Sequence, residues 1–389
     1  MINRRLFADD DYTAIVAKYF ADLRQAGLVD ADPSGWLFTY SEAEPWVVRP
    51  KVKARDIARY YIDEREALGV DKEKICALIS AWEKRPVSAN TVTVCPSGGC
   101  ASLITLAALK AAGVRRILFE TPAYFGTIEQ AVELGLKFEL VPTYARDGFE
   151  LPKLASIWRD QSSTALWVTQ PRASLGFNQS LAAFENFLRA HRRHYLVIDE
   201  ATDQSFPAHL GSLSQNFSKS NLVRLRSFTK GMGLNGFRLA AVIHPAALRA
   251  QLVGSVEALG GSLDVHSLKA VAAMADDIPR LKSMLAAANG QVVDLRAKAE
   301  RLVAGSPLRI NHLVNGYIGS LLADLSLLGK NHRSARRRLL EGCREVRTPV
   351  MLGATMYLAA DPPTEAIRLN FFSHPEHVTR GIANILRIW

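Results

Sequence analysis

The sequence has little of what marks membrane, secreted or metal-binding proteins. It offers no run of about eighteen uninterrupted apolar residues, and its first residues, MINRRLFADDDY, lack the apolar stretch of a signal peptide. It has only 4 cysteines, with no Cys-x-x-Cys pair, which argues against a disulfide scaffold. His191 and His194 are spaced like metal ligands, but no cysteine or carboxylate completes a set. We expect a cytoplasmic protein with reduced thiols, no metal and no membrane segment.

Neither apolar residues nor charges depart from ordinary globular composition. Apolar residues make up 48% of the chain and charged residues 22%, which argues against disorder. The net charge of +10 would suit nucleic acid, but it would equally attract an anionic cofactor and anionic substrates. The basic runs HRRH and SARRRLL are typical of solvated helix faces or helix ends. We therefore predict binding of small anions and no nucleic acid.

Helical and strand patterns alternate from about residue 70 to 245, as in a mostly parallel sheet covered by helices. The expected strands are short runs rich in Val, Ile and Leu: TVTVC, RRILFE, KFELVP, TALWVT, YLVIDE, LVRLRSFT and FRLAAVIH. The expected helices are KEKICALISAWEKR, GGCASLITLAALKAAG, GTIEQAVELG and LAAFENFLRAHRRH. In such sheets the functional residues collect at the carboxyl ends of the strands.

The C-terminal part has a different organisation. The stretch 278–304 predicts one long helix, with Gly290 as a weak point. It leads through VMLGATMYLAA and AIRLNFF to a last helix, VTRGIANILRI. We therefore divide the chain into an N-terminal arm, a large α/β domain and a smaller C-terminal α+β domain that includes the long helix. Their bounds are 1–50, 51–277 and 278–389.

A glycine motif, G-x-G-x-x-G, lies within SFTKGMGLNGFR at Gly231, Gly233 and Gly236. A dinucleotide site needs a helix after this motif and an acidic residue about twenty positions further on. Here the following residues, FRLAAVIH, suit a strand, and no such acidic residue ends a second strand. A P-loop also fails, because no Gly-Lys-Ser/Thr follows the glycines. The motif predicts a flexible loop between two strands.

Three residues around the glycines keep a specific spacing: Ser227, Lys230 and Arg238. This segment resembles the cofactor lysine segment of the pyridoxal-phosphate enzymes of the aspartate aminotransferase superfamily, fold type I. Upstream, Asp199 ends the strand YLVIDE, where that family keeps an aspartate against the pyridine nitrogen. The carboxylate would keep the nitrogen protonated, so that the ring can accept electrons from a substrate carbanion. By the same resemblance, Lys230 would hold the cofactor as a Schiff base and act as general base.

Three further segments match the family in order. ETPAYFG resembles the segment whose aromatic ring stacks on the cofactor, here Tyr124. CPSGGCASL resembles the phosphate-binding turn, where backbone N–H groups of Gly99 and Cys100 would receive the phosphate at a helix N-terminus. Gly98 would relieve crowding in that turn. AIRLNFF resembles the segment whose arginine, here Arg368, clamps the substrate α-carboxylate through two parallel hydrogen bonds.

The resemblance covers residues 35–389 and carries several implications. The implied fold has a mostly parallel seven-stranded sheet sandwiched by helices, plus a smaller C-terminal domain. The implied cofactor is pyridoxal 5'-phosphate, and the substrates are an amino acid and a 2-oxo acid. A homodimer with active sites at the subunit interface is expected, in which Tyr60 or Tyr61 reaches the partner's phosphate. Arg172 and His266 are conceivable readers of the substrate side chain, although the sequence favours surface positions for both.

Two departures from the family fall on one cofactor atom, the phenolic oxygen. QPRASLG stands where the family carries N-P-x-N-P-T-G, so that Ala173 replaces an asparagine. Thr202 replaces the tyrosine of the family's D-E-x-Y. Hydrogen bonds to that oxygen tune the acidity of the Lys230 imine. Without them the site could recruit Thr202, Asn178 or water, or it could run a different pyridoxal-phosphate reaction.

Three functions follow from these residues. The first is an aminotransferase that moves the amino group of an α-amino acid to a 2-oxo acid. The second is another pyridoxal-phosphate reaction at the same carbon, namely elimination, decarboxylation, cyclisation or oxidation, in specialised biosynthesis. The third is a cofactor-sensing regulator with a DNA-binding domain, although residues 1–69 contain no recognisable winged helix.

Overall fold

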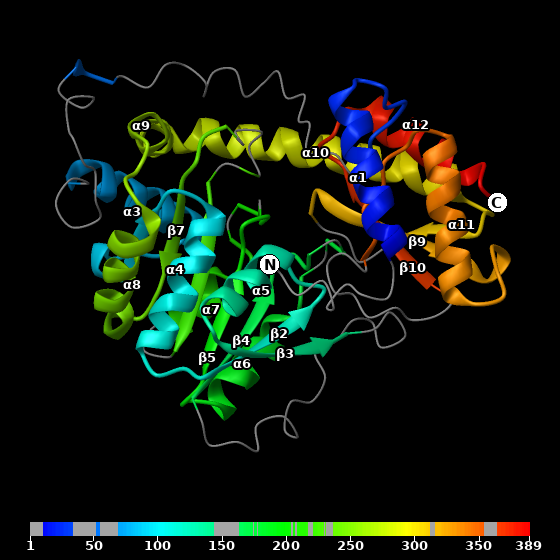
Figure 1. Ribbon diagram of the computed structural model, residues 1–389. Helices are drawn as coiled ribbons and strands as arrows, with labels where there is room; N and C mark the ends of the chain where they lie inside the picture. Colours follow the sequence, from blue (N-terminus) through cyan, green and yellow to red (C-terminus); the bar gives the residue numbers. More distant parts are fainter. Residues whose placement is uncertain are drawn as a thin grey trace.

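The computed structural model contains two β-sheets, each covered by helices and joined by one long helix (Figure 1). It describes the following residues: 11–33, 52–54, 69–143, 163–173, 175–176, 178–203, 205–206, 208–216, 221–228, 230, 236–311, 316–353 and 364–389. No helix within these ranges is both long enough and apolar enough to cross a bilayer.

The larger sheet has seven strands in the order β1-β7-β6-β5-β4-β2-β3. The strands are β1 (Val92–Cys95), β2 (Arg116–Thr121), β3 (Lys137–Pro142), β4 (Thr164–Thr169), β5 (Tyr195–Asp199), β6 (Leu222–Ser227) and β7 (Ala240–Ile243). Only β7 runs antiparallel to its neighbours, β1 and β6. The predicted mostly parallel sheet of seven strands is confirmed.

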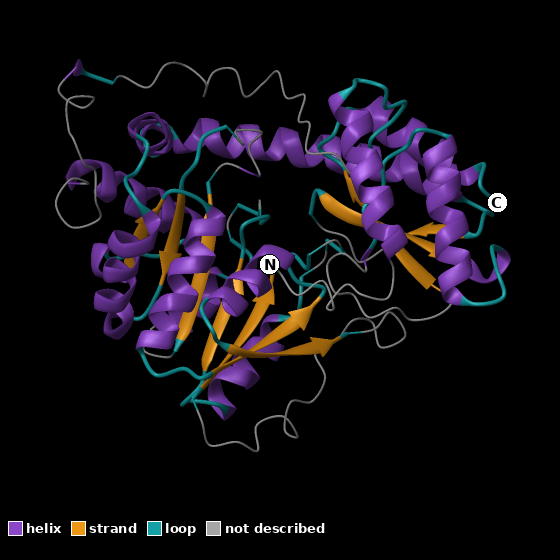
Figure 2. Ribbon diagram, in the orientation of Figure 1, coloured by secondary structure: helices purple, strands orange, loops and turns teal. Residues whose placement is uncertain are grey.

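Helices cover both faces of this sheet (Figure 2). They are α3 (Gly69–Glu83), α4 (Gly98–Ala111), α5 (Phe125–Glu133), α6 (Leu181–Ala190), α7 (Gly211–Asn216), α8 (Arg249–Ser255) and α9 (Val265–Met274). Alternate residues of a strand face opposite sides. In β4, Trp167 packs in the core with α4, α5 and α8. Its neighbours Leu166 and Val168 pack in the core with α6 and α7. Both faces are buried, which explains the uniformly apolar strands.

Two predicted boundaries are wrong by several residues. The helix expected through HRRH ends at Ala190, because His191 leaves helical geometry and the chain must turn before β5. The strand expected from Phe237 begins at Ala240, because residues 236–239 belong to the connection from the glycine loop. The second difference matters for function, since it leaves Arg238 in a loop at the end of the sheet.

The smaller sheet is antiparallel, with the order β10-β9-β8. Its strands are β8 (Leu308–Ile310), β9 (Ile318–Asp324) and β10 (Thr364–Asn370), and its helices are α1 (Asp11–Gln25), α11 (His332–Glu345) and α12 (Pro375–Leu386). The first five residues of AIRLNFF lie in β10, and the predicted last helix corresponds to α12. Within VMLGATMYLAA, Leu352 forms a single bridge to Ile367, and residues 354–360 lie outside the described part.

Helix α10 (Ile278–Val303) joins the two halves of the structure. Near its start, Leu281 and Leu285 pack in a core of the large sheet. Further along, Val292 and Leu295 pack in the core of the small sheet. Figure 1 shows α10 crossing from one half to the other. The helix continues through Gly290 without a break.

Short helical turns complete the architecture. They are the 3-10 turns η3 (Ala89–Thr91), η7 (Ala246–Leu248) and η9 (Leu325–Leu327), and the π-helical turn η8 (Val256–Gly260).

Candidate active site

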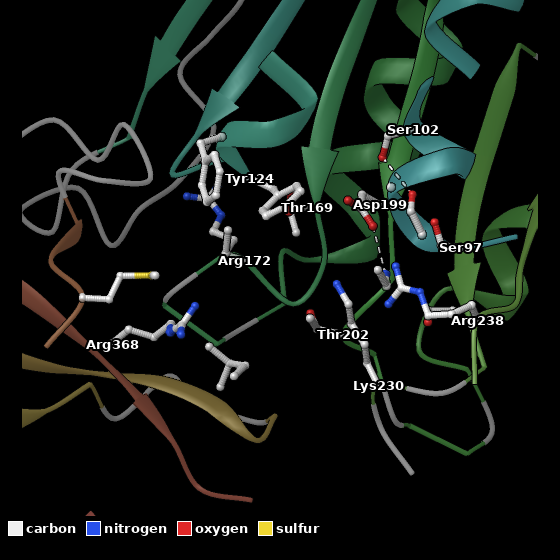
Figure 3. Close-up of a pocket in the computed structure, with 18 of the residues that line it drawn as sticks. Ser97, Ser102, Tyr124, Thr169, Arg172, Asp199, Thr202, Lys230, Arg238 and Arg368 are labelled. Atoms are coloured by element: carbon white, nitrogen blue, oxygen red, sulfur yellow. Dashed lines mark hydrogen bonds between the residues drawn. The ribbon is translucent and has the colours of Figure 1, made fainter. Parts of the chain in front are cut away.

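A pocket of about 430 Å³ lies at the carboxyl edge of the large sheet and reaches the small sheet. Parallel strands β4, β5 and β6 end in it at Thr169, Asp199 and Ser227. The small sheet contributes Ile318 and Arg368. Figure 3 labels Thr169, Asp199 and Arg368 among the side chains that line this pocket. A volume of this size suits a small-molecule ligand.

Lys230 stands in this pocket with an amine that burial makes easier to deprotonate. Its Nζ lies 5.8 Å from the centre of the Tyr124 ring. Burial is the main cause that lowers the pKa of Lys230, and the positive charges of Arg238 and Arg368 act in the same direction. Asp199 opposes them by raising the pKa. The Lys230 amine therefore lies near an aromatic ring and a carboxylate, and two arginines lie close enough to affect its pKa.

Asp199 lies at the end of β5 and is only 6% exposed. Its Oδ1 accepts a hydrogen bond from the backbone N–H of Ala201 at 2.9 Å. Burial raises the pKa of this carboxyl, while Lys230 and the Ala201 N–H lower it. Asp199 has the strand parity of Val197, which packs against α4, so it faces the side on which α4 begins. This placement aims a buried acid into the pocket.

The N-terminus of α4 forms the next wall. Ser97 caps the helix, because its Oγ accepts from the Cys100 N–H at 3.1 Å. Gly98 and Gly99 line the pocket, whereas Cys100 is not among its lining residues. Ser102 also lines it and donates to the Gly98 carbonyl at 3.1 Å. Of the predicted phosphate-binding residues in this turn, the two glycines face the cavity and the Cys100 N–H is already engaged.

Arg238 stands on the same side of the pocket as Ser97 and Ser102 in Figure 3. Its backbone N–H donates to Ser267 Oγ at 2.9 Å, which fixes the loop before β7. Its side chain is exposed and, within the described ranges, makes no hydrogen bond or ion pair. The combination of a helix N-terminus, hydroxyl groups and an available guanidinium suits a phosphate.

Arg368 lies on the far side of the pocket from Arg238 in Figure 3. It is 6% exposed on β10, and burial lowers its pKa to about 10. Asp32 and Tyr317 oppose this shift, whereas Arg24 adds to it. Arg24 itself holds Asp32 through hydrogen bonds of 2.6 and 3.2 Å. A buried arginine on a strand thus faces the cavity from the small sheet.

Arg172 is the largest correction to the sequence interpretation. The expected surface position is wrong, since Arg172 is 1% exposed and lines the pocket. It donates to the Glu120 carboxylate and, at 2.8 Å, to Thr143 Oγ1. His266, by contrast, is exposed, pairs with Asp264 and is not among the lining residues. A signal for Arg172 was its place between Pro171 and Ala173, directly after the apolar strand β4, but the sequence could not show its partner.

The loop that carries Arg172 is fixed to the small sheet by one glycine. Gly176 has a φ of +74°, and a Cβ there would lie 1.6 Å from the Ile318 carbonyl oxygen. The two backbones therefore touch, and only glycine fits. Ala173, in the same loop, lines the pocket and supplies no amide there, and Thr202 lines it as well. Asn178 is not among the lining residues.

Other predicted residues lie outside the described part of the chain. They are Tyr60, Tyr61, Gly231 and Gly233. Residues that sequence reasoning missed but the pocket includes are Ser97, Ser102, Phe125, Thr169, Ala201, Leu239, Ile318 and Met351.

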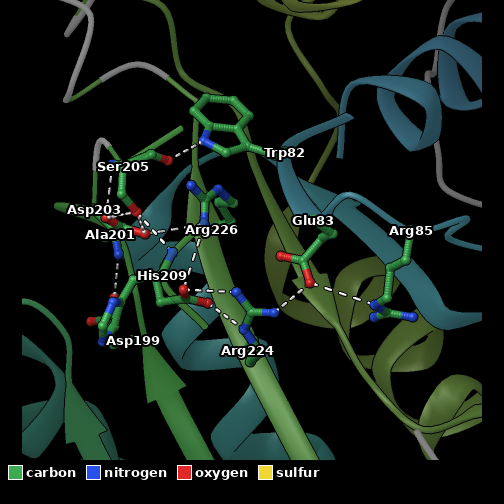
Figure 4. A network of polar contacts seen from close by, with 11 residues as sticks. Trp82, Glu83, Arg85, Asp199, Ala201, Asp203, Ser205, His209, Arg224 and Arg226 are labelled. Atoms are coloured by element: carbon green, nitrogen blue, oxygen red, sulfur yellow. Dashed lines mark hydrogen bonds and ion pairs between the residues drawn. The ribbon is translucent and has the colours of Figure 1, made fainter. Parts of the chain in front are cut away.

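Behind Asp199, on the opposite face of the sheet, lies a buried network of charges (Figure 4). Arg224 binds Glu200 and, at 2.6 Å, Glu83. Arg226 lies 3.5 Å from Glu200 and 3.4 Å from Asp203, and its guanidinium carbon lies 4.5 Å from the centre of the Trp82 ring. The network anchors both ends of the turn that carries Thr202.

A model of the family "Aminotransferase class I and II" matches residues 69–313. The chain belongs to this family. Class I and II aminotransferases are pyridoxal-phosphate enzymes, so this chain is a pyridoxal-phosphate-dependent transaminase.

Solved structures of class I and II aminotransferases have the same fold. A double mutant of Thermus thermophilus aspartate aminotransferase has a TM-score of 0.79 at 16% identity, with 100% of each chain covered. Aspartate aminotransferase from Thermotoga maritima has a TM-score of 0.77 at 15% identity, over 100% of this chain and 99% of that one. YbdL from Escherichia coli, described as having a methionine aminotransferase function, has 0.77 at 16%, over 96% and 97%. No curated protein matches the sequence.

The side chains that line the pocket of this aminotransferase suit the cofactor, independently of the family match. Asp199 is a buried acid whose charge needs a positive or donating partner, as a pyridine nitrogen with its proton would provide. Tyr124 offers a ring 5.8 Å from the lysine amine. Arg238 offers a guanidinium next to the N-terminus of α4. These groups match the nitrogen, the ring and the phosphate of pyridoxal phosphate.

Proposed function

We propose that the enzyme transfers the amino group of an α-amino acid to a 2-oxo acid, with Lys230 as the residue that holds the cofactor covalently. The observation that carries this proposal is the position of Lys230, partly buried between the Tyr124 ring and the Asp199 carboxylate. Pyridoxal phosphate, when bound, withdraws electrons from the carbon that bears the amino group. All other steps depend on residues of this chain.

The phosphate would be held by groups from three segments. These are the N–H groups at the start of α4 with Gly98 and Gly99, the hydroxyl of Ser227, and the guanidinium of Arg238. Cys100 was also predicted to donate its backbone N–H, but that N–H donates to Ser97. These groups would keep the cofactor in place while a substrate amine replaces the amine of Lys230.

Asp199 would bind the protonated pyridine nitrogen and Tyr124 would stack on the ring. The Ala201 N–H orients one oxygen of Asp199. Thr202 also lines the pocket. We assign its hydroxyl as the hydrogen-bond partner of the phenolic oxygen, in place of the family's asparagine and tyrosine. Because Ala173 has no side-chain amide, the described lining would offer that oxygen fewer partners than the family's usual site.

Lys230 would take the proton from the substrate α-carbon once its amine is free. Its lowered pKa favours the neutral amine that this role needs. Arg368 would bind the α-carboxylate through paired, charge-assisted hydrogen bonds and so orient the α-carbon toward Lys230. Arg368 and Lys230 are close enough for the charge of one to shift the pKa of the other.

A second candidate function uses the same pocket and cofactor for a different reaction of the amino acid. Ala173 and Thr202 line the pocket where the family has stronger partners for the phenolic oxygen. This difference favours elimination, decarboxylation, cyclisation or oxidation at the same carbon. A homodimer, a cytoplasmic location, a biosynthetic pathway and the domain limits at 50 and 277 stay predictions from the sequence.

The test is an absorbance scan of the purified holoenzyme with a panel of amino acids, combined with analysis of the products. Transamination predicts that the band of the lysine-bound cofactor converts to that of its amine form and that one 2-oxo acid appears per amino acid consumed. An amino acid consumed without a 2-oxo acid would establish the second function instead. No spectral response to any amino acid, combined with retention of DNA in a mobility-shift assay, would support the regulator.

A further inference from the structure

The cationic side chains of the pocket differ in how their charge is balanced. In the described part of the chain, the pocket is lined by Arg172, Lys230, Arg238 and Arg368. Lys230 has Asp199 as its anionic neighbour, and Arg238 faces the phosphate side of the cavity. Arg172 and Arg368 are therefore the two arginines to consider as readers of substrate carboxylates.

Arg368 keeps a positive charge for a ligand. The carboxylate that raises its pKa belongs to Asp32, but Asp32 is itself held by Arg24 at 2.6 Å. Because Arg24 balances Asp32, these three residues together keep one net positive charge. This small group can still attract one carboxylate of a substrate.

The charge of Arg172 is neutralised by a buried carboxylate that lies behind the surface of the pocket. Its guanidinium forms an ion pair with Glu120, and both side chains are 1% exposed or less. The Thr143 hydroxyl accepts a second hydrogen bond from the guanidinium and donates to the Thr121 carbonyl at 2.6 Å. The pair carries no net charge, and a carboxylate placed against it would meet the negative charge of Glu120 as well as the positive charge of Arg172.

Besides its charged neighbours Asp32 and Arg24, Arg368 shares the described part of the pocket lining with uncharged residues. Its backbone N–H donates to the Met351 carbonyl at 2.9 Å, and Met351 lines the pocket. Ile318 on the adjacent strand β9 lines it too, as does Phe125 from α5. A substrate whose α-carboxylate is bound by Arg368 would therefore place its side chain among uncharged groups.

We propose that Glu120 determines substrate specificity by neutralising Arg172, so that the enzyme takes α-amino acids with uncharged side chains and rejects dicarboxylic ones. The amino-acid part of this inference rests on the proposed function. The rejection of a second carboxylate follows from the Arg172–Glu120 pair alone and does not depend on the proposed function. Loss of the Glu120 charge converts Arg172 into a reader of that second carboxylate.

The test compares two four-carbon acids, maleate with two carboxylates and butanoate with one, by calorimetric titration of the holoenzyme. The wild-type protein should bind butanoate more tightly than maleate. Glu120→Gln should tighten maleate binding about tenfold or more and change butanoate binding by less than about twofold. The double variant Glu120→Gln with Arg172→Gln should lose the gain, because the released guanidinium is gone.

The result that overturns the proposal is tighter binding of maleate than of butanoate by the wild-type protein. If Glu120→Gln does not fold, as judged by circular dichroism, Arg172→Gln decides the question. Burial raises the pKa of Glu120, and this variant removes the Arg172 charge that opposes the rise. The proposal expects Arg172→Gln to leave the ratio of the two affinities within about twofold. A selective tenfold loss of maleate affinity in this variant would show that Arg172 already reads a carboxylate.

Activity assays then separate this inference from the proposed function. The wild-type enzyme should convert methionine and leucine in preference to aspartate, and Glu120→Gln should raise the kcat/KM for aspartate relative to methionine by about tenfold. Turnover of aspartate at least as fast as that of methionine would contradict the specificity assignment while supporting transamination. A protein that converts no amino acid but shows the expected maleate response would contradict transamination and leave the role of Glu120 supported.

Discussion

Arg224 holds Glu200 through two hydrogen bonds, 2.6 Å from Nε to Oε2 and 2.8 Å from Nη2 to Oε1, and both side chains are fully buried. Glu200 directly follows Asp199, so the pair fixes the backbone that aims Asp199 into the pocket. The Glu200 N–H also donates to the Leu225 carbonyl at 2.8 Å. Glu200, which stabilises the fold, and Asp199, which lines the pocket, are thus adjacent in the chain and lie on opposite faces of the sheet.

Arg224→Met should destabilise the protein by about 3 to 5 kcal/mol, because it removes the partner that lies 2.6 Å from both buried carboxylates, Glu200 and Glu83. Unfolding in urea measures the change. The matched control is Arg337→Ala, which removes an exposed pair with Glu341 and should cost less than about 1 kcal/mol. Equal effects of the two substitutions would contradict the structural role of the buried network.

Asp199→Asn should lower kcat about 100-fold or more while the cofactor stays bound. An amide keeps the size of the side chain and the bond from Ala201, but it cannot hold a positive charge on the pyridine nitrogen. Steady-state kinetics measure the loss, and absorbance confirms the cofactor content. A fully loaded variant with near wild-type kcat would show that Asp199 has no electronic role.

Arg368→Lys should lower kcat/KM for amino acids on the order of 100-fold, because a lysine cannot form two parallel hydrogen bonds to a carboxylate. The control is the corresponding amine without the carboxylate, whose reaction with the cofactor should change little. If the amine suffers as much as the amino acid, Arg368 supports the fold of the pocket and does not bind the α-carboxylate.

His244 should make folding stability depend on pH. It is 3% exposed, and burial lowers its pKa from 6.5 to about 4. Its two nitrogens lie 3.0 Å from Thr93 Oγ1 and 3.0 Å from the Pro245 carbonyl oxygen. Between these pKa values the unfolded chain binds more protons than the folded one. The contribution of His244 is therefore full above pH 6.5 and is lost as the pH falls toward 4.

The predicted loss amounts to about 3 kcal/mol between pH 6.5 and 4, and it should be absent in His244→Gln. Urea unfolding of both proteins at several pH values gives the difference between the two curves. Parallel curves would mean that His244 titrates in the folded protein as it does in the unfolded chain.

Sequence patterns located the large sheet because its strands are buried on both faces and therefore uniformly apolar. They also found Asp199, Ser227 and Arg238, because the family resemblance depends on the spacing of residues along the chain. The strands β8 and β9 and the helix α1 were missed. Strand β8 has only three residues, which is too short for a periodic signal.

The environment of Arg172 could not be predicted from the sequence in the same way. Its partner Glu120 lies 52 residues earlier in the chain, at the end of another strand. The pair forms only because β2 and β4 are neighbours in the sheet, and nothing local indicates that order. The same holds for Arg224, whose partner Glu83 comes from α3. Buried charge pairs depend on tertiary contacts, so a basic residue between strands looks like a surface residue.

The measurement that tests the central claim most directly is borohydride reduction of the purified protein, followed by peptide mass spectrometry. Lys230 should carry the reduced pyridoxal adduct, while Lys282, a lysine outside the pocket, should not. Lys230→Ala should be colourless, take no label and have no activity, whereas Lys282→Ala should resemble the wild-type protein. A label on another lysine, or transamination by Lys230→Ala at the wild-type rate, would contradict the account.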